Sequence, residues 1–318
     1  MRNQMPRLQR RKAFSRGYFT TVGGKLPAGL TTPVLGYRYQ KKLEISMSNR
    51  DLDHLRVKHK EELILSDYDS QAPKNDASED EKMMLNIQKL GDKLDKLQTL
   101  LYSGKQKGLL LVLQGMDTAG KDGSIRRVFS HISPLGVRAE AFGPPSALEL
   151  EHDFLWRIHS KTPSLGEIVV FNRSHYEDVL VTRVRGMVTR EICEQRYQDI
   201  VAFETLLERQ GIKVLKCFLN ISKNEQKRRL KERLDDPHKR WKLQPSDFED
   251  RKLWDQFQQA YQDAIKETST ADAPWYIIPA DSKHYRDFCL ASLLVQTLEQ
   301  MNLEVPKARY DFSKIELD

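Results

Sequence analysis

The sequence predicts an α/β fold in which a five-stranded parallel sheet is flanked by helices and interrupted by a helical insert. Three observations lead to this prediction. Short aliphatic runs alternate with amphipathic helical patterns, a glycine-rich loop follows the first run, and a charge-dense stretch without a strand precedes the last one. Strands that are aliphatic along their whole length are typical of a sheet covered by helices on both faces.

The individual elements follow from hydrophobic periodicity. Amphipathic patterns predict helices over residues 82–103, 121–132, 147–159, 189–210 and 283–301. Between them, short apolar runs predict strands at Leu109–Gln114, Val137–Phe142, Ile168–Phe171, Val214–Leu219 and Tyr276–Ile278. The pattern shows no internal repeat, so we expect one domain over residues 47–318.

The insert, residues 223–267, contains no predicted strand. Its first part, 223–252, carries eleven Lys or Arg against seven Asp or Glu. Pro237 separates two helical patterns, because proline disfavours helix continuation. The segment is therefore interpreted as a helical hairpin outside the core, which is either a solvated surface feature or a lid over a binding site.

The charge is distributed unevenly along the chain. Residues 1–46 hold ten Lys or Arg and one acid, whereas residues 47–318 carry a net charge of −2 out of the total of +7. A near-neutral body argues against nucleic-acid binding. The basic leader is typical of an organelle transit peptide, a disordered tail, or an over-extended start before Met47.

Two further features bear on location. The longest aliphatic run, Leu109–Leu113, is far shorter than the roughly 18 apolar residues of a membrane span. The three cysteines show neither disulfide nor metal-ligand spacing. We therefore expect a soluble protein without membrane contact in the cytoplasm, or in a mitochondrion or another organelle if the leader is a transit peptide.

A phosphate-binding loop is predicted after the first strand. Gly115 and Gly120-Lys121 form a G-x4-G-K pattern that opens a helix, so backbone N–H groups and the lysine can surround a phosphate. Where Ser or Thr usually follows the lysine, this chain has Asp122, and Asp117 lies between the glycines. A carboxylate inside a phosphate cradle requires a cation, so Asp117 is the candidate ligand for Mg²⁺ or Mn²⁺.

A second polar cluster, residues 171–178, follows the third predicted strand. Because ligands bind at the carboxyl ends of parallel strands, this cluster should face the phosphate loop. Arg173 can pair with phosphate oxygens, and Asn172 occupies the position of a possible second metal-binding carboxylate. An ionised phosphate acceptor needs no general base, so we interpret His175 as structural.

The remaining candidates come from the insert and from the loop after the second strand. Arg229 and Arg233 are four residues apart and share one helical face. Together with Lys239 and Lys242 they favour a cationic lid that closes over a transferring phosphoryl group. Phe142 is a candidate for the wall of a nucleotide pocket.

These clusters together resemble the polyphosphate kinase 2 family over residues 55–302. Residues 115–123 (GMDTAGKDG) resemble its first motif and residues 171–179 (FNRSHYEDV) its second. Residues 236–242 (DPHKRWK), Trp254 and residues 273–281 (APWYIIPAD) match its lid pattern. The FNRSHYEDV form is similar to the subgroup that phosphorylates AMP as well as ADP.

The resemblance implies a P-loop kinase fold of the thymidylate-kinase type and Mg²⁺-dependent, reversible phosphoryl transfer between inorganic polyphosphate and nucleotides. It implies that Asp117 is the metal ligand and that the catalytic residues are Asp117, Lys121, Arg173, Arg229 and Arg233. The predicted phosphate and nucleotide contacts are Gly115, Ala119, Gly120, Asp122, Gly123, Phe142, Glu177, Lys239 and Lys242.

Partners and alternatives complete the prediction. The expected substrates are polyphosphate with AMP, ADP and ATP, with guanine nucleotides as further candidates, and the family suggests a homo-oligomer, either dimer or tetramer. One alternative is an ATP-dependent nucleotide or small-molecule kinase on the same fold. The other is a non-catalytic polyanion-binding protein that uses the basic leader.

Overall fold

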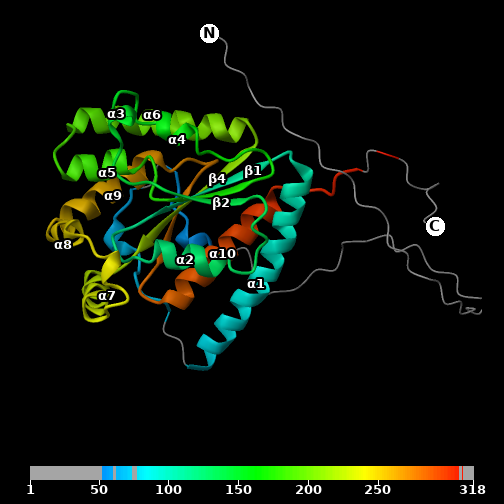
Figure 1. The fold of residues 1–318 in the computed structure, drawn as a ribbon, viewed down its shortest axis with the longest axis horizontal. Helices are drawn as coiled ribbons and strands as arrows, with labels where there is room; N and C mark the ends of the chain where they lie inside the picture. Colours follow the sequence, from blue (N-terminus) through cyan, green and yellow to red (C-terminus); the bar gives the residue numbers. More distant parts are fainter. Residues whose placement is uncertain (1–51, 60–61, 74–76, 308–309, 311–318) are drawn as a thin grey trace, which may run out of the picture. The chain divides into compact units, whose positions relative to one another are not determined.

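The computed structural model describes residues 52–59, 62–73, 77–307 and 310, and Figure 1 shows its arrangement around a single sheet. The five strands are all parallel and lie in the order β2-β3-β1-β4-β5. Their bounds are β1 (Gly108–Gln114), β2 (Val137–Ala141), β3 (Ile168–Asn172), β4 (Ile212–Asn220) and β5 (Trp275–Pro279). The predicted five-stranded parallel sheet is confirmed.

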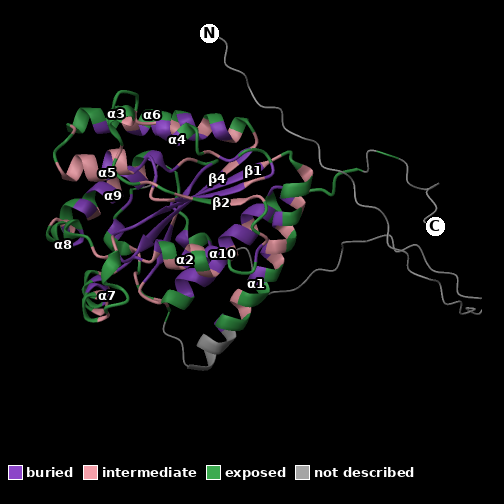
Figure 2. Ribbon diagram, viewed as in Figure 1, coloured by how far each residue is buried: buried purple, intermediate pink, exposed green. Residues whose placement is uncertain are grey.

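The centre of the sheet explains why its strands are so apolar. Strand β1 lies between β3 and β4, with Leu110 opposite Val169 on one side and Val214 on the other. Every residue of β1 is buried, as the purple centre of Figure 2 shows. A strand covered on both faces has no polar side, so its sequence is a continuous aliphatic run instead of an alternation.

Helices cover both faces of the sheet (Figure 1). One group comprises α1 (Ala77–Gly104), α2 (Lys121–Val128) and α10 (Lys283–Gln300), in which α10 packs against both α1 and α2. The other comprises α5 (Glu177–Val184), α6 (Arg190–Arg209) and α9 (Trp254–Thr268), which pack against one another. The crossover after β1 runs through α2, which places the glycine-rich loop at the middle of the sheet.

Two helix predictions need correction, and one helix was not predicted. The expected helix over 147–159 is two short ones, α3 (Ala147–Leu150) and α4 (Trp156–His159), separated by a loop. Helix α5 was not expected, because its first turn lies inside the polar 171–178 cluster. The insert forms α7 (Lys223–Asp235), a 3-10 turn (Arg240–Lys242) and α8 (Pro245–Lys252), but α9, which was assigned to the exposed hairpin, belongs to the core.

The burial of α9 explains this last difference. Trp254, Phe257, Tyr261 and Ile265 recur at helical spacing and are all at least nine-tenths buried. These side chains form one apolar face that packs against α5 and α6. The exposed, charge-dense part of the insert is therefore residues 223–252.

The chain before α1 covers the outer strand of the sheet. Val57 donates its backbone N–H to the carbonyl of Trp275 in β5, at 2.8 Å, and short 3-10 helices flank this contact at Asp53–Leu55 and Leu65–Asp67. The leader predicted at residues 1–46 lies outside the described residues. Within the described part of the chain, no helix is long and apolar enough to cross a membrane.

Candidate active site

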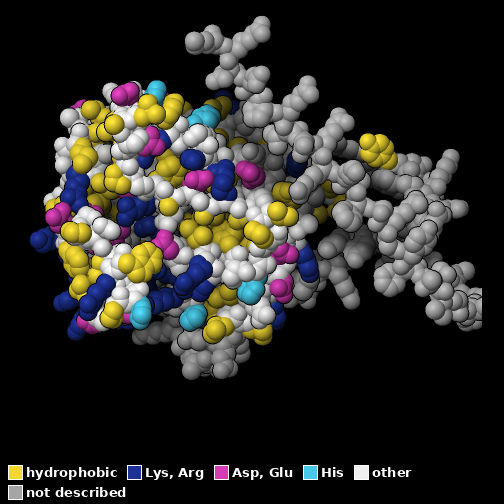
Figure 3. All heavy atoms as spheres, viewed as in Figure 1, with side chains coloured by type: hydrophobic (Ala, Val, Ile, Leu, Met, Phe, Trp, Pro, Cys, Tyr) yellow, Lys and Arg dark blue, Asp and Glu magenta, His cyan; other side chains and the backbone are white. Residues whose placement is uncertain are grey.

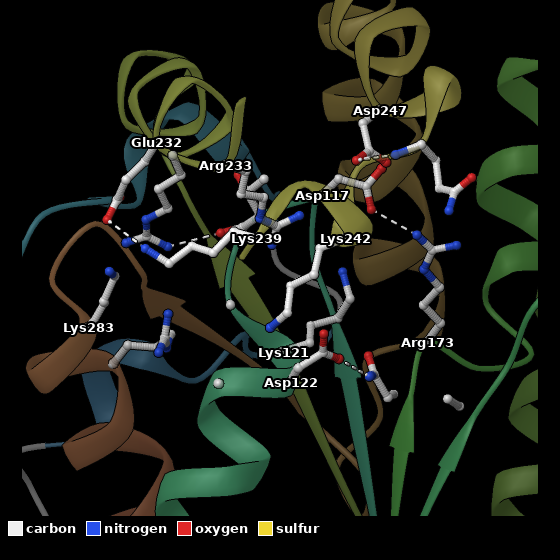
Figure 4. Close-up of a pocket in the computed structure, with 18 of the residues that line it drawn as sticks. Asp117, Lys121, Asp122, Arg173, Glu232, Arg233, Lys239, Lys242, Asp247 and Lys283 are labelled. Carbon is white, nitrogen blue, oxygen red and sulfur yellow. Dashed lines mark hydrogen bonds and ion pairs between the residues drawn. The ribbon is translucent and has the colours of Figure 1, made fainter. Parts of the chain in front are cut away.

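A pocket of about 490 Å³ opens at the carboxyl end of the sheet (Figure 4). Its walls come from the loop after β1, the start of the loop after β2, the end of β3, the insert and the first turn of α10. Strand order changes direction at β1, and ligands of open parallel sheets bind at such a point. The three predicted clusters thus meet at one opening.

The glycine-rich loop adopts a conformation that only glycine tolerates at two positions. Gly115 has φ +151°, and a Cβ there would lie 2.8 Å from the carbonyl of Leu219. Gly120 has φ +108°, and a Cβ there would collide with the guanidinium of Arg286. The loop therefore packs closely against β4 and α10, and Gly120 and Gly123 line the pocket.

Lys121 begins α2 and its side chain turns back over the loop. Its Nζ donates to the carbonyl of Gly115 at 2.6 Å, and the residue is only 8% exposed. Burial lowers the pKa of the Lys121 ammonium below its ordinary value, although Asp117 opposes the shift. A cation held this way needs little rearrangement to meet an incoming phosphate.

Asp117 and Arg173 are brought together from separate motifs. Arg173 Nη2 donates to Asp117 Oδ1 at 2.8 Å, although the residues are 56 positions apart in sequence. Burial acts against the Arg173 charge, but Glu177 and Asp117 outweigh it and raise the pKa of the guanidinium. Arg173 therefore remains charged, and it lines the pocket together with Asp117 (Figure 4).

The structure gives Asp122 and Asn172 a common role. The Asn172 amide at the end of β3 donates to the Asp122 carboxylate at the start of α2. Both residues line the pocket. The amide thus ties down the carboxylate that replaces the usual Ser or Thr, and Asn172 itself is a hydrogen-bond donor at this place.

Arg229 and Arg233, the two arginines expected to act together, occupy different environments. Arg229 is 5% exposed, and its five N–H groups are directed to protein oxygens: the carbonyls of residues 118, 119, 280 and 281 and the carboxylate of Glu225. Arg233, one turn later, lines the pocket and makes no hydrogen bond or ion pair within the described residues. Arg229 therefore joins the insert to the phosphate loop, and Arg233 presents its charge to the pocket.

Lysines of the insert extend the cationic wall (Figure 4). Lys239 and Lys242 line the pocket after α7, and Lys239 pairs with Asp236 at 2.9 Å. Figure 3 shows Lys and Arg side chains gathered on the surface between α7 and α2. The insert and the phosphate loop therefore contribute side chains to the same pocket.

Three predicted contact residues lie elsewhere. The Ala119 side chain is fully buried, and its carbonyl accepts from Arg229 and Arg286, so it packs the loop from within. Gly115 and Glu177 line a separate small cavity of about 30 Å³ behind the loop, next to Asp117 and Arg173. Burial raises the pKa of Glu177, with Arg173 and Lys121 opposing the shift.

Phe142 lies in the wall of the pocket, whereas His175 lies in the core. Phe142 lines the pocket, packs edge-to-face against Phe171 at 4.8 Å between ring centroids, and lies under the Arg157 guanidinium. His175 is fully buried and lines neither of these cavities, and its Nε2 lies 3.4 Å from Glu204. This position is consistent with a structural histidine.

Sequence reasoning missed part of the pocket wall. Arg127 in α2, Lys283 and Arg286 in α10, and Asp247 in α8 all line it. Lys283 follows the carboxyl end of β5. Because ligands bind at the carboxyl ends of parallel strands, this position in the sequence was a signal for Lys283. No sequence signal singled out Asp247, which is 5% exposed and points toward Asp117 in Figure 4.

The residues at the mouth fit a divalent cation held partly by its substrate. Asp117 presents a carboxylate in the pocket, and Asp247 faces it. Burial and the negative charge of Asp117 raise the pKa of Asp247. Among the described residues, no three His, Cys, Asp or Glu side chains group to hold a metal by themselves. The carboxylates of Asp117 and Asp247 fit Mg²⁺, which commonly takes one or two carboxylates together with phosphate oxygens and water.

The fold and the pocket together define a P-loop protein of the kinase class, with a phosphate loop, an opposing arginine and a cationic insert. Residues 75–306 match the family model of polyphosphate kinase 2, and the chain belongs to this family.

Individual relatives agree with this assignment. The chain is 50% identical over 229 residues to the AMP/ADP-polyphosphate phosphotransferase of Meiothermus ruber, covering 72% of this chain and 86% of that protein. It is 40% identical over 228 residues to the ADP-polyphosphate phosphotransferase of Rhodopseudomonas palustris, covering 68% and 79% respectively. The crystal structure of polyphosphate kinase 2 from Arthrobacter aurescens matches with a TM-score of 0.77 at 40% identity, covering 81% of this chain and 92% of that chain.

Proposed function

We propose that this protein is a polyphosphate-dependent nucleotide kinase that transfers a phosphoryl group reversibly between inorganic polyphosphate and nucleoside mono- and diphosphates. Relatives named as AMP/ADP- and ADP-polyphosphate phosphotransferases support the reaction class. The pocket supports a highly charged substrate. Its location at the phosphate loop supports transfer, rather than simple storage of a polyanion.

The observation that carries the proposal is the charge of the pocket wall. Nine Lys or Arg side chains line it against four Asp or Glu. They extend from the phosphate loop across the insert to the first turn of α10. Such a surface suits a linear polyanion bound beside a nucleotide, because each phosphate of the chain brings another negative charge.

The residues divide the work of phosphoryl transfer. Lys121 and Arg173 stabilise the charge that spreads over the transferring group, and Arg233 adds to this from the insert. Arg229 acts as a positioning residue, because its N–H groups hold the carbonyls of the phosphate loop. Since the accepting phosphate oxygen is already ionised, no side chain has to remove a proton.

We further propose Mg²⁺, or Mn²⁺ in its place, as the cofactor, with Asp117 as its protein ligand. When bound, the cation would neutralise phosphate charge during transfer. Arg173, now paired with Asp117 at 2.8 Å, lies close enough to contact the same phosphate group. Asp117→Asn should weaken Mn²⁺ binding measured by electron paramagnetic resonance, and unchanged binding would remove Asp117 from this role.

Glu177 is proposed to let the enzyme accept AMP as well as ADP. It lies behind the Asp117–Arg173 pair instead of lining the main pocket, so it would act through the placement of those two groups. Glu177→Asn is expected to lower AMP phosphorylation more than ADP phosphorylation. Equal losses with both acceptors would contradict this proposal.

The donor assay tests the function directly. Purified protein is incubated with polyphosphate and ADP, without any other triphosphate, and ATP formation is measured; AMP, GMP and GDP are then compared as acceptors. Rapid ATP formation is expected. Activity that needs ATP as the donor would favour an ordinary nucleotide kinase, and binding without turnover would favour a polyanion-binding protein.

Deletion of residues 1–46 separates this last alternative from the proposed function. Turnover is expected to persist without the basic leader, because the described residues of the cationic pocket wall are all part of the body. The chain is further proposed to form a dimer or a tetramer, which light scattering tests. It is also proposed to be cytoplasmic, which imaging of the tagged full-length chain tests.

A further inference from the structure

The backbone of Arg173 is held in a conformation that arginine rarely adopts. Its φ is +62°, in the left-handed region that favours glycine. A residue other than glycine keeps such a strained conformation only where surrounding contacts enforce it. This conformation aims the guanidinium at Asp117 and the pocket.

The first restraint is the residue that follows. Ser174 is fully buried, and its hydroxyl accepts from the side chain of Gln114 in β1 and from the backbone N–H of Tyr176, both at 3.1 Å. The hydroxyl therefore ties the turn after β3 to the end of β1. The Ser174 hydroxyl holds only the start of the turn. A second restraint is therefore needed to fix the direction of the chain after the turn.

That second restraint is a buried polar network at Tyr176. The Tyr176 hydroxyl donates to Glu204 Oε1 at 2.9 Å, and Lys216 Nζ donates to Glu204 Oε2 at 2.6 Å and to the carbonyl of Thr268 at 2.7 Å. The side chains of Glu204 and Lys216 are at most 2% exposed. These residues join the start of α5 to α6, to the end of α9 and to β4.

Stability alone does not account for such a network. Burying an ion pair is about neutral or unfavourable compared with well-packed apolar side chains, so its presence calls for another explanation. Hydrogen bonds are directional, and this set includes Lys216 of β4, a strand that pairs directly with the central strand β1. The Tyr176 ring is thereby tied to the sheet at a defined place.

We propose that Glu204 and Lys216 are positioning residues which, through Tyr176, hold the 173–176 turn so that Arg173 points into the pocket. The proposal rests on the proposed function only in that Arg173 handles substrate phosphate. It extends the site into the core, to side chains that line neither the main pocket nor the small cavity behind the loop.

The experiment is a double-mutant cycle between Tyr176→Phe and Arg173→Ala. Wild type, both single variants and the double variant are assayed for kcat and KM with polyphosphate and ADP. Tyr176→Phe is expected to reduce kcat/KM by about ten- to a hundredfold, because small displacements of a charge-stabilising group have effects of this size. In the Arg173→Ala background, the same change should alter kcat/KM by less than about twofold, because the group it positions is gone.

A matched control removes a hydroxyl from another buried tyrosine. Tyr197 is 5% exposed, its hydroxyl accepts from Arg183, and it lines neither cavity. Tyr197→Phe should leave kcat/KM within about twofold of wild type while changing the melting temperature about as much as Tyr176→Phe does.

Several outcomes would overturn the inference without touching the proposed function. An equal loss from Tyr176→Phe in both backgrounds would mean that it acts on general stability, and so would an equal loss in the Tyr197→Phe control. An unchanged kcat/KM in Tyr176→Phe would mean that no positioning is needed. If Arg173→Ala is too slow to assay, polyphosphate binding by the same four proteins replaces turnover and is judged by the same pattern. A wild type without turnover would instead refute the proposed function.

Discussion

The two sides of the pocket are built differently. On the sheet side, Lys121 is 8% exposed and bonded to its own loop, and Arg173 is paired with Asp117. On the insert side, Arg233 lacks a partner within the described residues, and the Lys239 side chain is 48% exposed. The sheet side is therefore fixed in place before a substrate arrives, whereas the insert side can adjust to it.

This difference between the two sides should affect catalysis and substrate binding in different ways. Preorganised charges stabilise a transition state without having to reorient, which favours placing them on strand ends. Exposed charges on a helical insert can follow substrates of different length and can open for product release. We therefore expect changes on the sheet side to act mainly on kcat, and changes on the insert side to act mainly on KM and on salt dependence.

The largest expected effect comes from removing the most buried charge of the sheet side. Lys121→Ala should reduce kcat by a hundredfold or more, corresponding to about 3–4 kcal/mol of transition-state stabilisation. Circular dichroism should show a folded protein, because the ammonium bonds only to carbonyls of its own loop. Turnover near that of wild type would contradict the assignment of this loop as the catalytic centre.

The next effect separates the two arginines of α7. Arg229→Met should lower the free energy of unfolding by about 2–4 kcal/mol, because it leaves buried carbonyls of the phosphate loop without donors. Arg233→Met should leave stability within about 0.5 kcal/mol of wild type. Urea titration of both variants measures this difference.

The catalytic activity of the Arg233 variant gives a second test of the different roles of these two arginines. Arg233→Met should lower kcat/KM by about tenfold as a pocket charge is lost. Equal losses of stability in the two variants would show that the insert does not distinguish a positioning arginine from a pocket arginine.

The salt concentration should affect the two sides of the pocket differently, with a smaller effect than the substitutions above. Raising the salt concentration from 50 to 300 mM should increase KM for polyphosphate by about three- to tenfold, because exposed charges of the insert side are screened. The kcat at saturating substrate should change less. If kcat falls in parallel with the rise in KM, the buried charges are as accessible to salt as the exposed ones.

The smallest expected effect is a shift in the pH profile. Burial lowers the pKa of Lys121 below 10.5, so its charge is lost at a lower pH than for an ordinary lysine. The alkaline limb of kcat/KM should therefore lie below pH 10.5, and it should move upward in Lys121→Arg, whose guanidinium stays charged. A limb that does not move in this variant belongs to another group.

Much of the fold was predictable because its signals are local. The five predicted strands each overlap an observed one, since a strand buried on both faces must be apolar along its length. The phosphate loop was recognisable for a similar reason, because the conformations of Gly115 and Gly120 exclude side chains. Helix α5 was missed where functional residues replace the apolar pattern at its start.

The insert shows where composition misleads. Residues 223–252 and 254–268 are both polar overall, but Phe257, Tyr261 and Ile265 lie on one face of α9 and anchor it in the core. The spacing of those three side chains carried this information. The exposed segment therefore ends before α9, earlier in the chain than the charge-based prediction of 223–267.

The identity of the chemical groups, their order along the chain and the strands that carry them can be read from the residues alone, because each depends on neighbours within a few positions. The different roles of Arg229 and Arg233 cannot be read from the sequence in this way. Both lie on one face of one helix. Their roles differ because Arg229 donates to carbonyls of the phosphate loop and of residues 280 and 281. Packing brings those partners together across more than fifty positions of sequence, and that long-range geometry leaves no local pattern to read.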